Sequence, residues 1–266
     1  MKKIILTLVC IILLGVASSC NQGKTPAPIV KNGITYQINK DRGGYTIISV
    51  DTELTEISIP AVLNILPVSV IGKNAFKDSK ASVIKMTNSI KEIQDNAFQN
   101  CKALEEIFIS NKVVTMGIGV FKNASSLKSV IFEEESILDR IQKDTFYGCT
   151  SLTKLQLPPR IRSIGERAFY KCTSLEEIAP ILTLGVIDSS AFEGCTNLKT
   201  FYLNRTISVI NPRAFYKCTN LHLQCESPEA NSNWREDWNL LLEEKVGDKP
   251  SVKTYLSSIT WNVPRG

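Results

Sequence analysis

The sequence predicts a solenoid of stacked, similar coils, and two observations support this fold class. A phenylalanine recurs along the chain at steps of 22, 23, 25, 23, 23 and 23 residues. The recurring residues are Phe76, Phe98, Phe121, Phe146, Phe169, Phe192 and Phe215. The motif Ala-Phe-x-x-Cys-Thr-x-Leu also occurs twice, at residues 168–175 and 191–198. A period in the twenties is typical of units that bury their apolar faces only against one another.

Each unit contains a segment typical of a short strand and a segment that returns the chain. The pattern Leu-x-x-Ile-x-Leu falls at positions +6, +9 and +11 after the phenylalanine. It predicts one parallel strand per coil, with the apolar residues facing inward. The pattern Ile-x-x-x-Ala-Phe-x-x-Cys predicts the return, through short turns or helical turns, with the phenylalanine filling the coil.

Residues 152–172 (LTKLQLPPRIRSIGERAFYKC) resemble the unit of the BspA-like, or Treponema-type, leucine-rich repeat family. The resemblance extends over roughly residues 45–225 and implies a leucine-rich-repeat solenoid, rich in β-structure and capped at both ends. It also implies adhesion to host or bacterial surface proteins. The chain departs from the family pattern at Ser82 (+6), at Pro180 (+11) and near residues 133–135, where two extra residues predict a bulged loop.

Five of the eight cysteines occupy one position of the repeat, three residues after the phenylalanine. They are Cys101, Cys149, Cys172, Cys195 and Cys218. Ser79 and Ala124 fill the position in the other units, so it requires a small side chain, and we expect buried free thiols. Disulfide bonds are the alternative, because equivalent atoms of stacked coils lie about 4.8 Å apart. Parallel side chains do not converge as that bond requires, however. A zinc site is disfavoured because the chain has no C-x-x-C pair and only one histidine, His222.

Residues 1–19 are typical of a signal peptide, because Lys2 and Lys3 precede an apolar run and small residues lead to Cys20. The segment Ala17-Ser18-Ser19-Cys20 resembles the lipobox of bacterial lipoproteins, although leucine is more usual at its first position. The resemblance implies lipidation of Cys20 and attachment to a membrane through that anchor. It further implies an outer-membrane lipoprotein, at the cell surface or on the periplasmic face. Ordinary cleavage beside an incidental cysteine is the alternative.

The rest of the chain divides into four predicted parts. Residues 20–33 are a polar tether that could span about 40 Å at most. Residues 34–66 alternate like strands and form an N-terminal β cap, with a hairpin turn at residues 41–44 (Asp-Arg-Gly-Gly) because glycine tolerates positive φ. Residues 67–225 form an array of about seven repeats, and residues 226–266 form a C-terminal cap.

Within the C-terminal cap, residues 231–245 predict a helix with Ser232 as its N-cap and one apolar face formed by Trp234, Trp238, Leu241 and Leu242. Residues 252–263 alternate like a strand. The tryptophans could form a sugar or cofactor site, or they could cover the last coil. We favour the second interpretation, because a repeat array needs its terminal coil covered.

The sequence shows no catalytic, cofactor or metal motif. A single histidine leaves no Ser-His-Asp set, and there is no Gly-rich phosphate loop, H-E-x-x-H motif or EF-hand spacing. The consecutive acids at residues 133–135 point in different directions, which favours a solvated loop over a cation site. The formal charge of +5 is spread among interspersed acids and bases and does not indicate nucleic-acid binding. We predict no enzyme, cofactor or small-molecule substrate.

The outward positions of the predicted strand are the candidate binding face. Position +10 is occupied by Phe108, Ile131, Gln156, Ala179 and Tyr202. The flanking position +8 is occupied by Glu106, Ser129, Lys154, Glu177 and Thr200. An apolar, aromatic stripe edged with polar residues is typical of a protein-binding surface. The alternative is that these side chains contact only one another or are covered by a neighbouring segment.

The sequence therefore favours a cell-envelope lipoprotein that acts as a protein-binding, adhesion-type scaffold. The partner expected is a host or bacterial surface protein. The alternative function is an accessory subunit that docks onto an outer-membrane complex for polysaccharide handling or transport.

Overall fold

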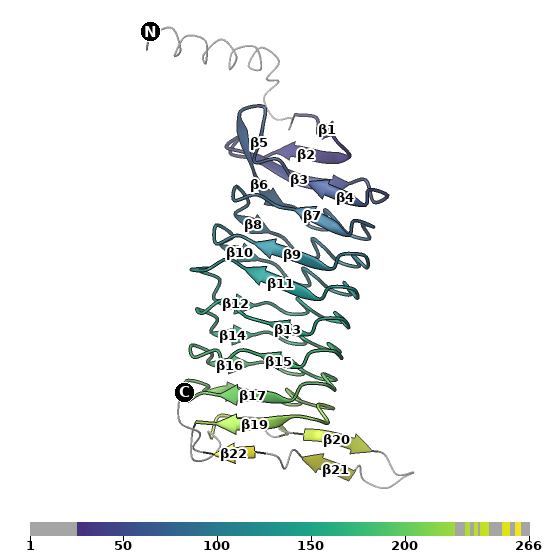
Figure 1. Ribbon diagram of the computed structural model, residues 1–266. Coiled ribbons are helices and arrows are strands. Elements are labelled where there is room, and N and C mark those ends of the chain that lie inside the picture. The colour runs from purple at the N-terminus through teal and green to yellow at the C-terminus, as the bar shows by residue number, and fades with distance from the viewer. Residues whose placement is uncertain are drawn as a thin grey trace.

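The computed structural model describes residues 26–226, 232–234, 237–238, 240–244, 252–255 and 259–261. The chain winds into a column of stacked coils, from the N-terminal end at the top of Figure 1 to the C-terminal end at the bottom. Strands and turns make up the described residues, among which there is no helix. The predicted leucine-rich-repeat solenoid is confirmed, with short turns rather than helical turns between its strands.

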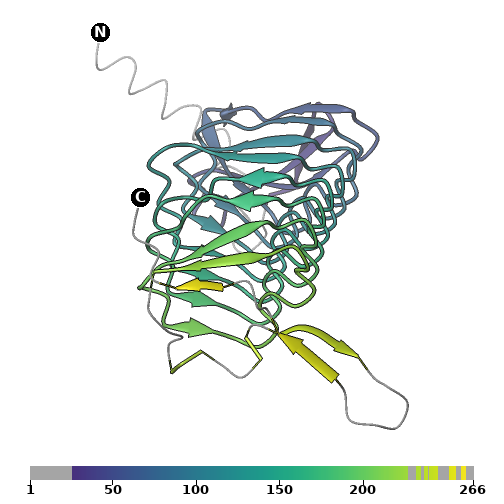
Figure 2. The same cartoon turned by 60° about the horizontal axis from the view of Figure 1, so that its bottom comes forward.

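Each repeat coil contains the predicted strand and, in addition, a second strand just before the phenylalanine, which has two residues in every unit after the first. The predicted strands form the long-strand face: β4 (Glu56–Ser58), β7 (Val83–Lys85), β9 (Glu106–Ile109), β11 (Ser129–Phe132), β13 (Lys154–Leu155), β15 (Glu177–Ile178), β17 (Thr200–Leu203) and β19 (His222–Cys225). The second strands form the short-strand face: β8 (Glu92–Ile93), β10 (Thr115–Met116), β12 (Arg140–Ile141), β14 (Ser163–Ile164), β16 (Val186–Ile187) and β18 (Val209–Ile210). Figure 2 shows the two sets of strands on different sides of the column.

Parallel pairing places each residue beside its equivalent in the next coil. Ile131 of β11 pairs with Phe108 of β9, and Ile164 of β14 pairs with Ile187 of β16. A residue type that recurs in the repeat therefore forms a column of like side chains along the solenoid.

The phenylalanines form such a column through the core. All seven are fully buried. Centroids of successive rings lie 5.0 to 5.6 Å apart, and most of the rings are nearly parallel. This spacing is that of favourable aromatic pairs. The predicted inward position of the phenylalanine is confirmed.

The segment around each phenylalanine forms a third side of the coil, which we call the turn face. Its backbone is left-handed at two positions of every repeat unit, two residues before and two residues after the phenylalanine. At the first position the residues are Asn74, Asn96, Gly119, Asp144, Arg167, Ser190 and Arg213, and at the second Asp78, Asn100, Asn123, Gly148, Lys171, Gly194 and Lys217. This conformation turns amide groups toward the next coil, as where the N–H of Phe146 donates to the carbonyl of Ala168 at 2.8 Å.

The cysteine position is buried in the core. All five repeat cysteines are free and fully buried. Of the two side chains that replace a cysteine in other units, that of Ala124 is fully buried and that of Ser79 is nearly so. Each thiol donates a hydrogen bond to the carbonyl of the phenylalanine in the preceding coil, at 3.0 to 3.1 Å. Burial raises the pKa of the Cys101 thiol to about 12 and raises the pKa of Cys172 as well. The predicted column of free thiols is confirmed.

The N-terminal end begins with strands β1 (Ile29–Lys31), β2 (Ile34–Ile38) and β3 (Tyr45–Val50), which pair antiparallel in that order. Strand β3 then pairs in parallel with β6 (Leu66–Ile71), which continues into the short-strand face. The hairpin turn expected between β2 and β3 is present, but the residue with positive φ is Arg42 rather than a glycine. Strand β5 (Val62–Leu63) forms a second hairpin with β6.

Both parallel sheets are interrupted at the 25-residue step. The ladder of the long-strand face stops between β11 and β13, as it also does between β7 and β9, and that of the short-strand face stops between β10 and β12. The turn face continues here, with the N–H of Phe121 bonded to the carbonyl of Thr145 at 2.9 Å. Just before the long strands, the N–H of Thr153 also donates to the carbonyl of Lys128 at 3.4 Å. The buried carboxylate of Asp144 reinforces this side, because it pairs with Lys122 of the preceding coil and Arg167 of the next, each at 3.0 Å.

The C-terminal region differs from its prediction. Residues 240–244 form strand β20 (Leu240–Glu244), which pairs antiparallel with β21 (Val252–Tyr255), instead of the predicted helix. A left-handed residue interrupts any helix there, since Asp237 has a φ of 60°. Strand β22 (Ile259–Trp261) pairs in parallel with β19 and so covers the last edge of the long-strand face.

The tryptophans pack against the end of the array. The indole N–H of Trp234 donates to the carbonyl of Ile207 at 3.2 Å. The rings of Trp234 and Trp238 meet edge to face with centroids 4.7 Å apart. These contacts support the interpretation that the tryptophans cover the last coil.

Residues 1–25, and with them Cys10, Cys20 and the predicted lipobox, lie outside the described residues. Among the residues that are described, none belongs to a helix long and apolar enough to cross a membrane.

Candidate binding groove

The predicted binding residues lie on the outer side of the long-strand face. Phe108 and Ile131 are the most open of the apolar ones, with 42% and 45% of their surface exposed. They are direct neighbours in the parallel pairing of β9 and β11. Gln156 is also exposed, whereas Ala179 and Tyr202 are half-buried. The structure therefore brings the first three residues together on an open surface.

An open groove of about 960 Å³ lies over this part of the face. Its floor runs from β9 to the loop after β15 and crosses the interruption between β11 and β13. The residues that line it are Phe108, residues 129–135, residues 154–159, Glu177, Ala179 and Pro180. Four of the five predicted residues are among them, and Tyr202 is not. A second hollow of about 590 Å³ over β7 and β9 shares Phe108 and continues the groove toward the N-terminal end.

Tyr202 departs from the prediction of an open aromatic residue. Its ring is half-buried, and its hydroxyl is buried without a hydrogen-bond partner among the described residues. It pairs with Gln224 of β19, close to the end that β22 covers. A position near a cap is shielded in a way that the repeat pattern alone does not predict.

The edge of the groove is polar and its side chains are complementary across coils. The hydroxyl of Ser129 donates to the carboxylate of Glu106 at 2.7 Å. Lys154 of β13 pairs in register with Glu177 of β15, so opposite charges lie side by side. These polar residues form a rim around the apolar floor and leave the groove open.

The acidic loop at residues 133–135 forms one wall of the groove, and Glu133 holds it in place. Its carboxylate accepts hydrogen bonds from the hydroxyl of Ser110 at 3.0 Å and from the N–H of Asn111 at 2.8 Å. The amide of Asn111 also donates to the carbonyl of Glu134. Glu133 is therefore a structural acceptor, and no cluster of three or more potential metal ligands occurs in the part of the chain that the structure describes.

The sequence pattern did not predict two of the residues that line the groove and the adjoining hollow. Phe132 occupies an inward position of the repeat, but it is half-buried and lines the groove. Val83 of β7 is exposed and lines the adjoining hollow. The 25-residue step is the sequence feature that could have predicted the partial exposure of Phe132. An insertion directly after a strand loosens the packing of the last residue of that strand.

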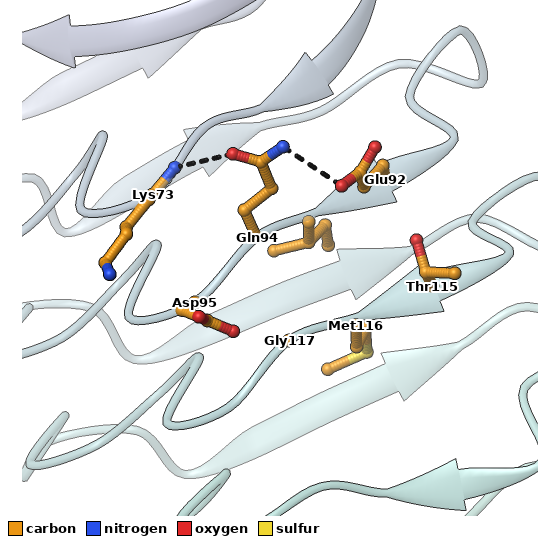
Figure 3. A pocket seen from close by; sticks show the side chains of 8 residues that line it. Lys73, Glu92, Gln94, Asp95, Thr115, Met116 and Gly117 are labelled. Carbon is orange, nitrogen blue, oxygen red and sulfur yellow. Dashed lines mark hydrogen bonds between the residues drawn. The ribbon is translucent and has the colours of Figure 1, made fainter.

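A smaller hollow of about 290 Å³ lies on the short-strand face (Figure 3). Three of its polar side chains, those of Glu92, Gln94 and Asp95, are already hydrogen-bonded within the protein. Gln94 accepts from the N–H of Lys73 and donates to Glu92, while Asp95 accepts from the N–H of Ile118. This hollow has no exposed aromatic residue among those that line it. The long-strand groove is the better candidate for binding.

Comparisons with solved structures support the fold. A leucine rich cell surface protein from Faecalibacterium prausnitzii is 25% identical, with a TM-score of 0.67 over 86% of this chain and 61% of that one. A leucine-rich repeat protein from Eubacterium ventriosum is 24% identical, with a TM-score of 0.62 over 73% of this chain and 50% of that one. One from Bacteroides ovatus is 23% identical, with a TM-score of 0.53 over 77% of this chain and 54% of that one. This chain thus spans between half and about three fifths of their lengths.

A search of curated proteins finds no significant match. The model of the BspA type leucine rich repeat region, in contrast, matches six copies within residues 49–139 and 135–227. These ranges contain all seven core phenylalanines and the whole groove. The chain therefore belongs to the BspA type leucine rich repeat family.

Proposed function

We propose that the protein is a cell-envelope lipoprotein whose long-strand groove binds another protein. The observation that carries this proposal is the pair formed by Phe108 and Ile131, which stand side by side and open on the groove floor. Folding alone gives no reason to expose both, because neighbouring coils have Gln156 and Ala179 at the same position. Aromatic residues surrounded by a polar rim are typical of interface hot spots.

The surroundings of this pair also fit a protein partner. The groove is long and open rather than enclosed, and a small-molecule site normally buries most of its ligand. The flanking Glu106, Ser129, Lys154 and Glu177 supply hydrogen-bonding groups at the edge of the apolar floor. The similarity to a protein described as a leucine rich cell surface protein is consistent with a partner met at the cell surface.

The location at the envelope rests on the lipobox and on Cys20. Lipid chains on Cys20 would hold the protein at a membrane, since two or more chains anchor stably where one does not. The Cys20→Ala variant should therefore lose its lipid and move to the soluble fraction, with its mass checked by spectrometry. Unchanged membrane retention of that variant would contradict the anchor, and protease treatment of intact cells then distinguishes the surface from the periplasm.

A photo-crosslinking residue in place of Gln156 tests the binding role in cells. This side chain is exposed within the groove, so a bound protein should be captured there. The matched control carries the same group at Val114, which is also exposed but lies at the short-strand face. Capture from position 156 alone supports the groove, and capture of an outer-membrane complex would favour the accessory-subunit function. Equal labelling from both positions, or none from 156, would contradict the proposal.

A further inference from the structure

The N-terminal end of the solenoid exposes several aliphatic side chains. Ile65, at the tip of the β5–β6 hairpin, and Val30, in the first strand, each have 71% of their surface exposed. Val62, on the same hairpin, is exposed as well. These are the most open large apolar residues of the described chain, and Figure 1 shows the hairpin rising to the level of β1 at that end.

The hairpin tip is unfavourable for folding in two ways. Leu63 pairs with Leu66, so Asn64 and Ile65 form a two-residue turn with φ values of 45° and 67°. Such turns favour glycine at the second position, whereas a β-branched residue is a conformational outlier there. A residue that is both strained and exposed contributes little to the fold, which points to a contact outside it.

The start of the described chain lies at the same end. The carbonyl of Pro26 accepts a hydrogen bond from the side chain of Gln37 at 2.8 Å, and β1 begins at Ile29. Only the segment between Cys20 and Pro26 is then left to act as a tether, although residues 20–33 were predicted to do so. Its six steps span about 20 Å at most, half the reach expected from the sequence.

We propose that this end of the solenoid rests on the lipid surface, with Ile65 and Val62 of the hairpin tip and Val30 among the headgroups. The proposal depends on the lipid anchor at Cys20. A short tether holds the N-terminal end at the bilayer. Transfer of aliphatic side chains from water to the boundary between headgroups and acyl chains is favourable. The column of coils then projects away from the membrane and presents the long-strand groove to proteins outside it.

The test uses an environment-sensitive fluorophore on the full-length lipidated protein, carried at Ile65→Cys. Selective labelling is feasible because the six described cysteines are free but buried. The protein is placed in vesicles of phosphatidylethanolamine and phosphatidylglycerol, with and without lipids that carry a quencher. A blue shift and loss of emission are expected at position 65. The control is Leu182→Cys, an exposed aliphatic site far along the array, which should show neither change.

Two outcomes would overturn the inference, and they are distinguishable. Protein that sediments with the vesicles while its label at 65 ignores the quencher shows that the anchor holds and the tip does not touch lipid. Protein that stays in solution and lacks the mass of the lipid contradicts the anchor and the lipid contact together. Val62→Cys is a second labelling site on the same hairpin and should respond as position 65 does.

Discussion

The thiol of Cys172 donates a hydrogen bond to the carbonyl oxygen of Phe146, 3.1 Å away in the preceding coil. The same bond recurs from the other four repeat cysteines. Each one satisfies a polar group inside an otherwise apolar column and joins successive coils. The cysteines are therefore structural, and their chemistry follows from burial.

Replacing Cys172 with alanine should leave the fold intact, because Ala124 fills the equivalent position of another coil. We expect the free energy of unfolding to fall by about 1–2 kcal/mol, from the lost hydrogen bond and the small void. Chemical denaturation of wild type and variant measures this difference. Thiol titration gives a second check, since the six buried cysteines should react only after denaturation. Blocked thiols in denatured, unreduced protein would instead indicate disulfides.

Stability should decrease as the pH rises above about 9. Burial holds the pKa of Cys101 at about 12, against 9.0 for an ordinary thiol, so the unfolded chain loses this proton first. The contribution of the protonated, buried thiol to stability is complete below pH 9 and is lost as the pH rises toward 12. Over this range the free energy of unfolding should fall with a limiting slope of about 1.4 kcal/mol per pH unit. The melting temperature of Cys101→Ala should depend less on pH than that of wild type. Identical slopes would show that the thiol does not titrate in this way.

Removing one core ring should destabilise the whole array. The ring of Phe169 lies 5.2 Å from that of Phe146 and 5.1 Å from that of Phe192, and it is fully buried. Phe169→Ala should reduce the free energy of unfolding by about 3–5 kcal/mol. The exposed Phe108 is the matched control, and Phe108→Ala should change stability by less than about 1 kcal/mol. Equal losses would place Phe108 in the core.

The left-handed positions of the turn face predict opposite effects for two substitutions at equivalent sites. Gly148 has a φ of 70°, and a Cβ there would lie 2.6 Å from Oδ1 of Asn123. Gly148→Ala should therefore lower stability by about 1–2 kcal/mol. Lys171 has a φ of 58° at the same place in the next coil, and Lys171→Gly should be neutral or stabilising. Melting curves of both variants compare them directly, and a destabilised Lys171→Gly would contradict the strain argument.

The sequence predicted most of the core because the repeat multiplies each signal. The phenylalanine, the small residue three positions later and the alternating strand residues recur in most units. An inward position inferred in one unit is therefore supported by the equivalent position in the others. The second strand of each coil escaped prediction, because two residues such as Ser163 and Ile164 are too short to show a period. The left-handed positions were not predicted either. Glycine would have indicated a positive φ, but Arg167 and Lys171 occupy two of these positions.

The regions outside the repeat were harder to predict. The spacing of Trp234 and Trp238 is compatible with one face of a helix, but both residues sit in turns and pack against the last coil. In the candidate site, the open positions of Phe108 and Ile131 follow from the alternation of the strand. The shielding of Tyr202 depends on neighbours from a different part of the chain, and the groove crosses an interruption of the long-strand sheet that the repeat pattern does not predict.

The affinity of the captured partner for surface variants tests the groove most directly. The double variant Phe108→Ala/Ile131→Ala removes the apolar pair, and Val114→Ala/Ile118→Ala removes an equally exposed pair at the short-strand face. With the partner identified by crosslinking, each groove substitution should weaken binding by about 1–3 kcal/mol, while the control pair should leave the affinity unchanged. Undiminished affinity of the groove variant, or an equal loss in the control, would contradict a binding site on the long-strand face.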